Sequence, residues 1–166
     1  YTELSEEWYV SRTTIYGDIN HFKDEIKPYN ISIKNNSTGS FVIGEEENIQ
    51  EYSIEKIKKA LELPTVKAIN DFETRLKTFF LDKHVNDIKF LLDKINEKLD
   101  KKMRDSYFAN LLVSLLVLIT RKDNGFSLNK KDGFITLKND SMMLYGFTLN
   151  FVDRLTERTN ISFNDP

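Results

Sequence analysis

The spacing of apolar positions divides the chain into two stretches of different character. Residues 1–50 combine a helical period with a short period-two alternation, whereas residues 54–160 carry helical spacing almost throughout. Apolar residues three and four positions apart fall on one face of a helix, and alternating ones fall on one face of a strand. The pattern predicts a mostly helical chain with a boundary near residues 51–64.

The first stretch predicts a helix, a turn and a second helix. A short helix that ends before Ser11 is lined on one side by Leu4, Trp8 and Val10. Ser11 is the predicted N-cap of the next helix, because a serine hydroxyl can accept a hydrogen bond from an amide of the first turn. Pro28 marks the end of that helix. Its inward stripe, at spacings of four, three and four, is Ile15, Ile19, Phe22 and Ile26.

A two-stranded hairpin is predicted after the second helix. Ile31 and Ile33 alternate with polar residues, the same alternation returns at residues 41–43, and the run Asn-Asn-Ser-Thr-Gly at residues 35–39 supplies turn residues. A helix, a tight turn, a second helix and a hairpin form the layout of a winged helix-turn-helix. A small α+β module without a nucleic-acid role has the same pattern.

The residues of the turn favour the first of these readings. Residues 4–19 read Leu-Ser-Glu-Glu-Trp-Tyr-Val-Ser-Arg-Thr-Thr-Ile-Tyr-Gly-Asp-Ile. They closely resemble the recurrent bacterial motif in which a short helix is followed by Val-Ser-Arg and by a Thr-Ile start to the recognition helix. With the apolar stripe inward, the polar face is left to a major groove, where arginine can read guanine and hydroxyls can bind phosphates or base edges. The predicted DNA-binding residues are Ser11, Arg12, Thr13, Thr14, Tyr16 and Asn20, with Gly17 on the same side.

The hairpin carries a resemblance of its own. Asn-Ile-Ser-Ile at residues 30–33 and Gly-Ser-Phe-Val-Ile-Gly-Glu-Glu-Glu-Asn-Ile at residues 39–49 look like the hairpin of activators that carry a phosphotransferase-system regulation domain. In that family the hairpin leads into a Gly-x-Glu segment, which Gly44 and Glu46 match, and then into a linker helix. The family's usual basic residue after the segment is absent here, since Gln50 and Glu51 follow.

The second stretch predicts about five helices. Turn signals interrupt them at residues 123–125 and 130–133, and a short extended piece is predicted at 134–137. The expected fold is therefore mostly α, a partial winged helix-turn-helix followed by a five-helix bundle like the regulation domain. The predicted helices cover residues 54–61, 66–81, 85–99, 105–121 and 140–158. The expected domains are a partial DNA-binding domain at 1–50, a linker helix at 51–64 and a regulatory domain, incomplete at its C-terminus, at 65–166.

Residues 106–125 are the most informative part of the second stretch. They resemble the helix of the regulation domain that carries a phosphorylatable histidine, and Arg121 and Gly125 match that helix, but Ser114 stands in place of the histidine. The resemblance implies that a phosphocarrier or permease component of the phosphotransferase system phosphorylates such domains and thereby shifts dimerisation. Serine cannot take that route, so this copy is expected to be a structural or dimerising unit or to answer another signal.

Two positions remain as regulatory candidates in this region. Ser114 is one, although a small polar residue in a helix packing seam is the more common role. His84 is the other, placed just ahead of a predicted helix, where a surface or capping role is the more common one.

Composition narrows the class of protein further. The chain has 166 residues, 40% of them hydrophobic, which is enough for a core, and no cysteine. Without cysteine or the residue order of a secretory signal, it is expected in the cytoplasm. Its longest apolar run, residues 111–119, is about half of what a bilayer crossing needs, so no membrane insertion is expected. A net charge of -2 gives no general attraction to nucleic acid. Any DNA affinity must therefore come from a local surface or from a partner segment, and residues 1–29 hold six acidic residues against three basic ones.

Catalysis has no support in the motifs. The chain lacks His-x-x-x-His, Gly-x-Ser-x-Gly and Walker-type loops, so neither an enzyme nor a metal or other cofactor is expected. The leading hypothesis is a dimeric activator that binds double-stranded DNA at sugar-uptake operons, of the mannitol-operon-activator type or a virulence regulator of the Mga type. The alternative is a protein-interaction bundle with a degenerate helix-turn-helix. Antiterminators share the regulation domain but begin with a β-rich module, which the helical start contradicts.

Overall fold

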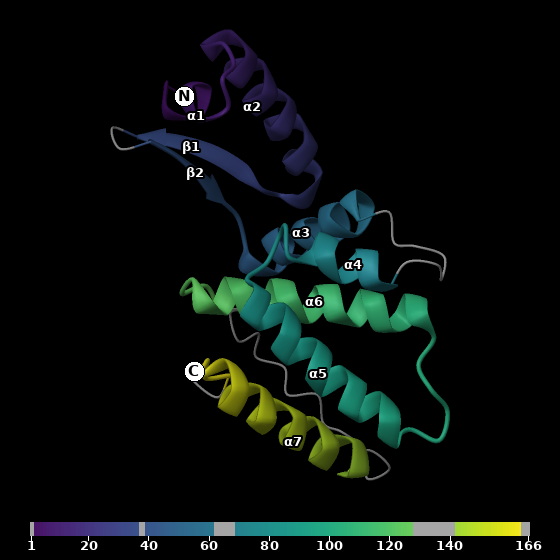
Figure 1. The fold of residues 1–166 in the computed structure, drawn as a ribbon. Helices are drawn as coiled ribbons and strands as arrows, with labels where there is room; N and C mark the ends of the chain where they lie inside the picture. Colours follow the sequence, from purple (N-terminus) through teal and green to yellow (C-terminus); the bar gives the residue numbers. More distant parts are fainter. Residues whose placement is uncertain (1, 37–38, 62–68, 128–141, 164–166) are drawn as a thin grey trace. The chain divides into compact units, whose positions relative to one another are not determined.

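The computed structural model describes residues 2–36, 39–61, 69–127 and 142–163. The chain divides into two compact units, residues 1–52 and 53–166. The described part is mostly helical with one two-stranded sheet, so the predicted fold class is confirmed (Figure 1). The turn expected at 130–133, the extended piece expected at 134–137 and the predicted helix starts at 66 and 140 lie outside the described residues. The elements are α1 Thr2–Glu7, α2 Arg12–Ile26, the 3-10 turn η1 Lys27–Tyr29, β1 Ser32–Asn36, β2 Gly39–Ile43, α3 Glu46–Ala60, α4 Ile69–Leu76, α5 Asp82–Lys98, α6 Asp105–Asp123 and α7 Met142–Thr159.

Helix α1 is shorter than the apolar spacing predicts. It ends at Glu7, so Trp8 and Val10 follow the helix and are exposed, and the prediction that they line its side was wrong. The cause is Tyr9, whose φ of 54° lies in the left-handed region. The Val10 amide then donates to the Ser5 carbonyl oxygen at 3.1 Å, the closing bond of a Schellman motif. A helix cannot continue through that conformation.

Helix α2 begins where the sequence predicts. The Ser11 hydroxyl accepts a hydrogen bond from the Thr14 amide at 3.0 Å, which confirms Ser11 as the N-cap. Of the predicted stripe, Ile15 and Ile26 are fully buried. The helix gives way to η1, which contains Pro28, and Asn30 after it has a φ of 57°.

The hairpin and the start of α3 complete the first unit. Strands β1 and β2 are antiparallel, with Ile33 opposite Val42. Gly44 follows β2, and a Cβ at this position would lie 3.2 Å from Ile31 Cγ1, so only glycine allows this approach without a shift. The ring of Tyr52 in α3 meets the rings of Tyr29 and Phe22 edge to face, with centroids 5.1 Å and 6.0 Å away. These aromatic contacts close the small core below the hairpin.

Helix α3 starts earlier than predicted. The apolar spacing predicted a start at residue 54 and the linker helix was expected from residue 51, whereas the helix begins at Glu46. Its first turns are polar and lack a clear apolar stripe, so the spacing of apolar residues did not predict that they are helical. Glu46 and Glu47 in the first turn favour a helix start there, because carboxylates interact well with the positive end of the helix dipole.

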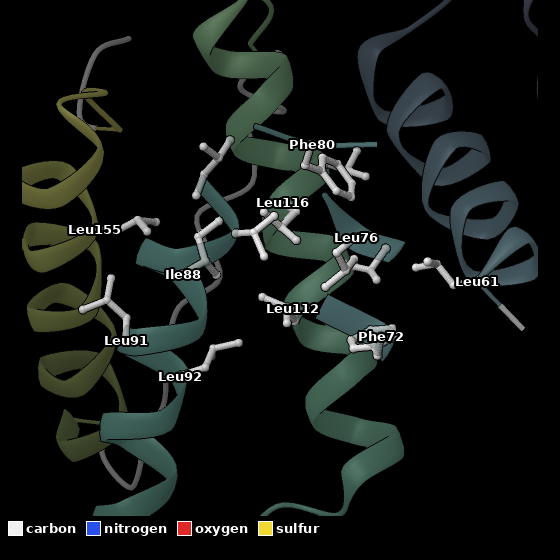
Figure 2. Close-up of a cluster of buried hydrophobic side chains, with 14 of the residues drawn as sticks. Leu61, Phe72, Leu76, Phe80, Ile88, Leu91, Leu92, Leu112, Leu116 and Leu155 are labelled. Carbon is white, nitrogen blue, oxygen red and sulfur yellow. The ribbon is translucent and has the colours of Figure 1, made fainter. Parts of the chain in front are cut away.

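The second unit is a helical bundle with one apolar core. Helix α5 packs against both α6 and α7 (Figure 1). Figure 2 shows Leu155 of α7 pointing toward α5, while Leu112 and Leu116 of α6 meet residues from α4 and α5. The buried members of this core are Leu61, Phe72, Leu76, Phe80, Val85, Ile88, Leu91, Leu92, Leu112, Val113, Leu116, Val117, Ile119, Leu155 and Ile161.

Two helix ends in this unit differ from the predicted ones. Helix α4 ends at Leu76, not at residue 81, because the Thr78 and Phe79 amides donate three residues back, as in a turn. Helix α5 begins at Asp82, so His84 lies inside its first turn and is only 4% exposed. The expectation of a surface or capping histidine was therefore wrong. Helix α6 runs through to residue 123, close to the predicted turn.

Hydropathy along the described helices is too low for a membrane crossing. None of the helices in the four described ranges combines the length and the apolar character that would span a bilayer.

Candidate nucleic-acid interface

The start of α2 is organised by two hydroxyl groups. The Oγ of Ser11 lies 2.8 Å from the Oγ1 of Thr14 and also accepts the Thr14 amide hydrogen bond. Both residues are exposed, but their hydroxyls are engaged with each other. Ser11 and Thr14 therefore fix the first turn of α2 and, with it, the direction of the neighbouring side chains.

Three of the predicted DNA-binding residues come together at this end of α2. Arg12, Thr13 and Tyr16 line a shallow hollow, and Thr2 of α1 completes its wall. The Tyr16 side chain is 58% exposed. Within the described residues, Arg12 has neither a hydrogen bond nor an ion pair. Its guanidinium can therefore take a phosphate or a guanine edge with its fork of donors intact.

The same face continues along α2. Thr13, Gly17 and Asn20 recur at spacings of four and three, which places them on one side of the helix. A Cβ built on Gly17 meets no atom within 4 Å, so open space lies over the backbone there. The Asn20 side-chain oxygen, Oδ1, accepts a weak hydrogen bond from Lys23 Nζ at 3.4 Å. The face is polar, open and nearly free of bulky side chains around Gly17.

Several exposed apolar residues of the first unit escaped the sequence analysis. Trp8 is 59% exposed in the turn before α2. Phe41, Val42 and Ile43 of β2 are all exposed as well. The sequence predicts only two strands in the first unit, and a hairpin without a third strand leaves much of its surface in water. This prediction could have indicated that the apolar side chains of the hairpin are exposed.

The first unit is acidic. Residues 1–52 hold ten acidic and four basic residues, a net charge of -6. Arg12 is the sole basic residue of the first 22. An approach to DNA by the start of α2 can therefore use Arg12, hydroxyl and amide groups and the positive end of the helix.

The two regulatory candidates lie in the second unit. Ser114 is half-buried in α6, and its hydroxyl donates to the Asn110 carbonyl oxygen at 2.9 Å. The Nε2 atom of His84 lies 3.6 Å from Asp123 Oδ2, and its Nδ1 is enclosed without a hydrogen-bond partner among the described residues. The structure does not bring Ser114 and His84 into one site. Across the described ranges, His, Asp and Glu side chains form no cluster of three that could hold a metal ion.

The first unit has the parts of a winged helix-turn-helix. A short helix, a turn of four residues, an N-capped second helix and a hairpin follow one another, as in that class of DNA-binding proteins. Residues 1–62 match the family model of the Mga helix-turn-helix domain. No curated protein and no solved structure matches the chain. The family match supports a DNA-binding regulator with a helix-turn-helix like that of Mga.

Proposed function

We propose that this chain belongs to a transcription regulator that reads double-stranded DNA with the exposed face of α2. The observation that carries the proposal is the open group of Arg12, Thr13 and Tyr16 at the start of an N-capped helix. It lies in the segment that matches the Mga helix-turn-helix domain.

Each residue of this face has a distinct proposed role. Ser11 and Thr14 hold the first turn in shape, so that the amino end of α2 can approach a phosphate. Arg12 supplies the charge and a bidentate donor pair. Thr13 and Tyr16 supply hydroxyls for phosphate oxygens or base edges. Gly17 lets the DNA backbone approach the helix closely.

The second unit is proposed to carry the regulation. The resemblance of residues 106–125 to a phosphotransferase-system regulation domain supports control of carbohydrate-uptake genes, as an activator in the cytoplasm. Candidate partners are a second copy of the chain and phosphocarrier or permease components. Ser114 cannot form a phosphohistidine, and His84 is buried with its Nε2 beside Asp123. This unit is therefore proposed to act through association rather than through phosphate on either residue, with no catalytic role.

A titration of the full chain against its own upstream DNA, at low and at moderate salt, tests the proposed function. We expect binding that prefers this DNA over unrelated duplex and weakens with salt, because phosphate contacts release counterions. R12Q and T13A should each reduce the preference, by about five- to a hundredfold for the arginine if it reads a base. K83Q, which removes an exposed charge from α5, is the matched control. Binding without any preference, or an R12Q variant that binds like the native chain, would contradict the assignment of α2.

The acidity of the first unit favours one alternative. A module with a net charge of -6 could use its exposed Trp8 and β2 side chains to bind protein instead of DNA. Absence of duplex binding even at low salt, together with self-association of the chain in light scattering, would select this interaction module.

A further inference from the structure

The two units carry opposite charge. Residues 53–166 hold twenty basic and sixteen acidic residues, a net charge of +4, against -6 for residues 1–52. A DNA-binding chain whose reading unit is acidic needs positive charge from another surface, because phosphate neutralisation supplies most of the sequence-independent affinity. The second unit is where such charge is available.

One positively charged segment of this unit is residues 98–104, from the last residue of α5 to the residue before α6, which we call the basic turn. The turn holds Lys98, Lys101, Lys102 and Arg104 against a single acidic residue, Asp100, and all five are exposed. Figure 1 shows it at the right-hand end of α5 and α6. Seven residues therefore carry a local net charge of +3.

The shape of the basic turn is held by one asparagine. The Asn96 side-chain oxygen accepts the Met103 amide at 2.7 Å, and the Asn96 carbonyl accepts Lys102 Nζ at the same distance. Within the described ranges, the side chains of Lys98, Lys101 and Arg104 make no hydrogen bond and no ion pair. Three cations are thus displayed from a fixed backbone without an internal partner.

The positive surface continues from the basic turn across α5. Lys94 and Lys98 line a shallow hollow with Asn150 and Arg154 of α7, over a floor that includes Leu91 and Phe151. Lys94 is paired with Glu97 at 2.8 Å, whereas Arg154 donates only to the neutral Asn150. The unpaired charge therefore lies on the basic turn and at Arg154.

We infer that the basic turn contacts the phosphate backbone of double-stranded DNA. This inference rests on the proposed function and adds to it a second, sequence-independent contact surface. Exposed, unpaired lysines and arginines on a polar turn can bind a polyanion such as the DNA backbone, because phosphate contacts depend on charge and not on a shaped pocket. An acidic protein partner would be expected to bury an aromatic or aliphatic anchor in a well-formed pocket, and the hollow beside the turn is shallow.

The salt dependence of DNA binding by the full chain tests the inference. K101Q/R104Q removes two unpaired charges from the basic turn, and K59Q/K83Q removes two exposed charges elsewhere in the same unit as the matched control. The slope of log K against log salt is negative, and each lost phosphate contact lowers its magnitude by about 0.9. K101Q/R104Q should therefore lower the magnitude of the slope by about 1.8. The loss of affinity should therefore grow about tenfold as salt falls from about 200 mM to about 50 mM.

The loss must also be equal on upstream and unrelated DNA, because phosphate contacts carry no sequence information. A slope unchanged in K101Q/R104Q, or lowered equally by K59Q/K83Q, would overturn the inference while leaving sequence-selective binding by α2 intact. Salt-sensitive binding that depends on the basic turn but shows no sequence preference would support the inference and contradict the proposed reading by α2. Circular dichroism of both variants checks that the helices are retained.

Discussion

Four residues with left-handed backbones follow helical segments in the described chain, and one of them is unusual. Asn30, Gly125 and Asn160 are residue types that accept a positive φ at low cost. Tyr9, after α1, is a bulky residue with a φ of 54°. Since its side chain is 94% exposed, no burial compensates the strain locally. The conformation nevertheless sets the turn between α1 and α2, just ahead of the residues proposed to contact DNA.

Replacing Tyr9 by glycine should therefore stabilise the first unit. We expect Y9G to raise its free energy of unfolding by about 1 kcal/mol, because glycine adopts the left-handed conformation without the Cβ penalty. Urea denaturation followed by the fluorescence of Trp8, the single tryptophan, measures the change. Y9A is the control, since alanine removes the ring but keeps the Cβ. Equal stabilisation by Y9A would show that the ring, and not the backbone, is the source of strain.

A substitution at Gly17 should change the stability of α2 and the binding of DNA in opposite directions. Gly17 lies within α2 with open space over it, so G17A should stabilise the helix by about 0.5–1 kcal/mol. If DNA approaches this face closely, the added methyl group should weaken binding at the same time. Thermal denaturation and a DNA titration of the same preparation measure both effects. N86A, an exposed site in α5, should gain stability without loss of binding. A G17A chain that binds normally would place the DNA elsewhere.

At the scale of elements, side-chain pairs join the helices of the bundle. Lys89 of α5 lies 3.1 Å from Glu73 of α4 and 2.8 Å from Asp93 on its own helix. The hydrogen bond to Asp93, with a further one to Glu73, raises the pKa of Lys89 above its ordinary value of 10.5, against the opposing effect of partial burial. Arg158 of α7 similarly binds Asp87 of α5 through two nitrogens, at 2.9 Å and 3.1 Å. These pairs fix α4 and α7 against α5 around an apolar core.

K89M removes the ion pairs of Lys89 with Glu73 and Asp93. It should lower the free energy of unfolding of the second unit by about 0.5–1 kcal/mol at neutral pH, since these pairs are only partly screened by solvent. A pKa raised by folding means that the stabilisation is present below the ordinary lysine pKa and is lost as pH rises through the folded-state value. The difference between native and K89M chains in urea denaturation should therefore shrink in strongly alkaline buffer. K94M, which breaks the exposed pair with Glu97, is the control with a smaller expected effect. A difference that persists at high pH would point to lost packing of the lysine stem instead.

At the scale of the whole molecule, the large apolar core and the residues proposed to contact DNA belong to different units. The large core belongs to residues 53–166, and the predicted reading face belongs to residues 1–52. Net charge is divided as well, with the acidic unit holding the reading helix. This division is why we assign sequence reading to α2 and sequence-independent charge to the basic turn.

Leu116 is fully buried at the centre of the core of the second unit (Figure 2). L116A should lower the free energy of unfolding by about 2–5 kcal/mol, since the lost contacts leave a cavity that the helices fill only in part. Circular dichroism of the helical signal during urea denaturation measures it. Y107A, at an exposed position of the same helix, should change stability by less than about 0.5 kcal/mol. Comparable effects of both substitutions would mean that the core assignment is wrong.

The sequence by itself determined the features that depend on neighbouring residues. The apolar spacing placed α2, α5 and α6 to within a few residues, and Ser11 identified the N-cap, because period and capping are local properties. The polar residues of the α2 face followed from that spacing. Tertiary structure alone decided the packing of Tyr52 of α3 on rings from other elements and the burial of His84 beside Asp123. Those outcomes depend on contacts between residues far apart in the chain, which no local pattern records.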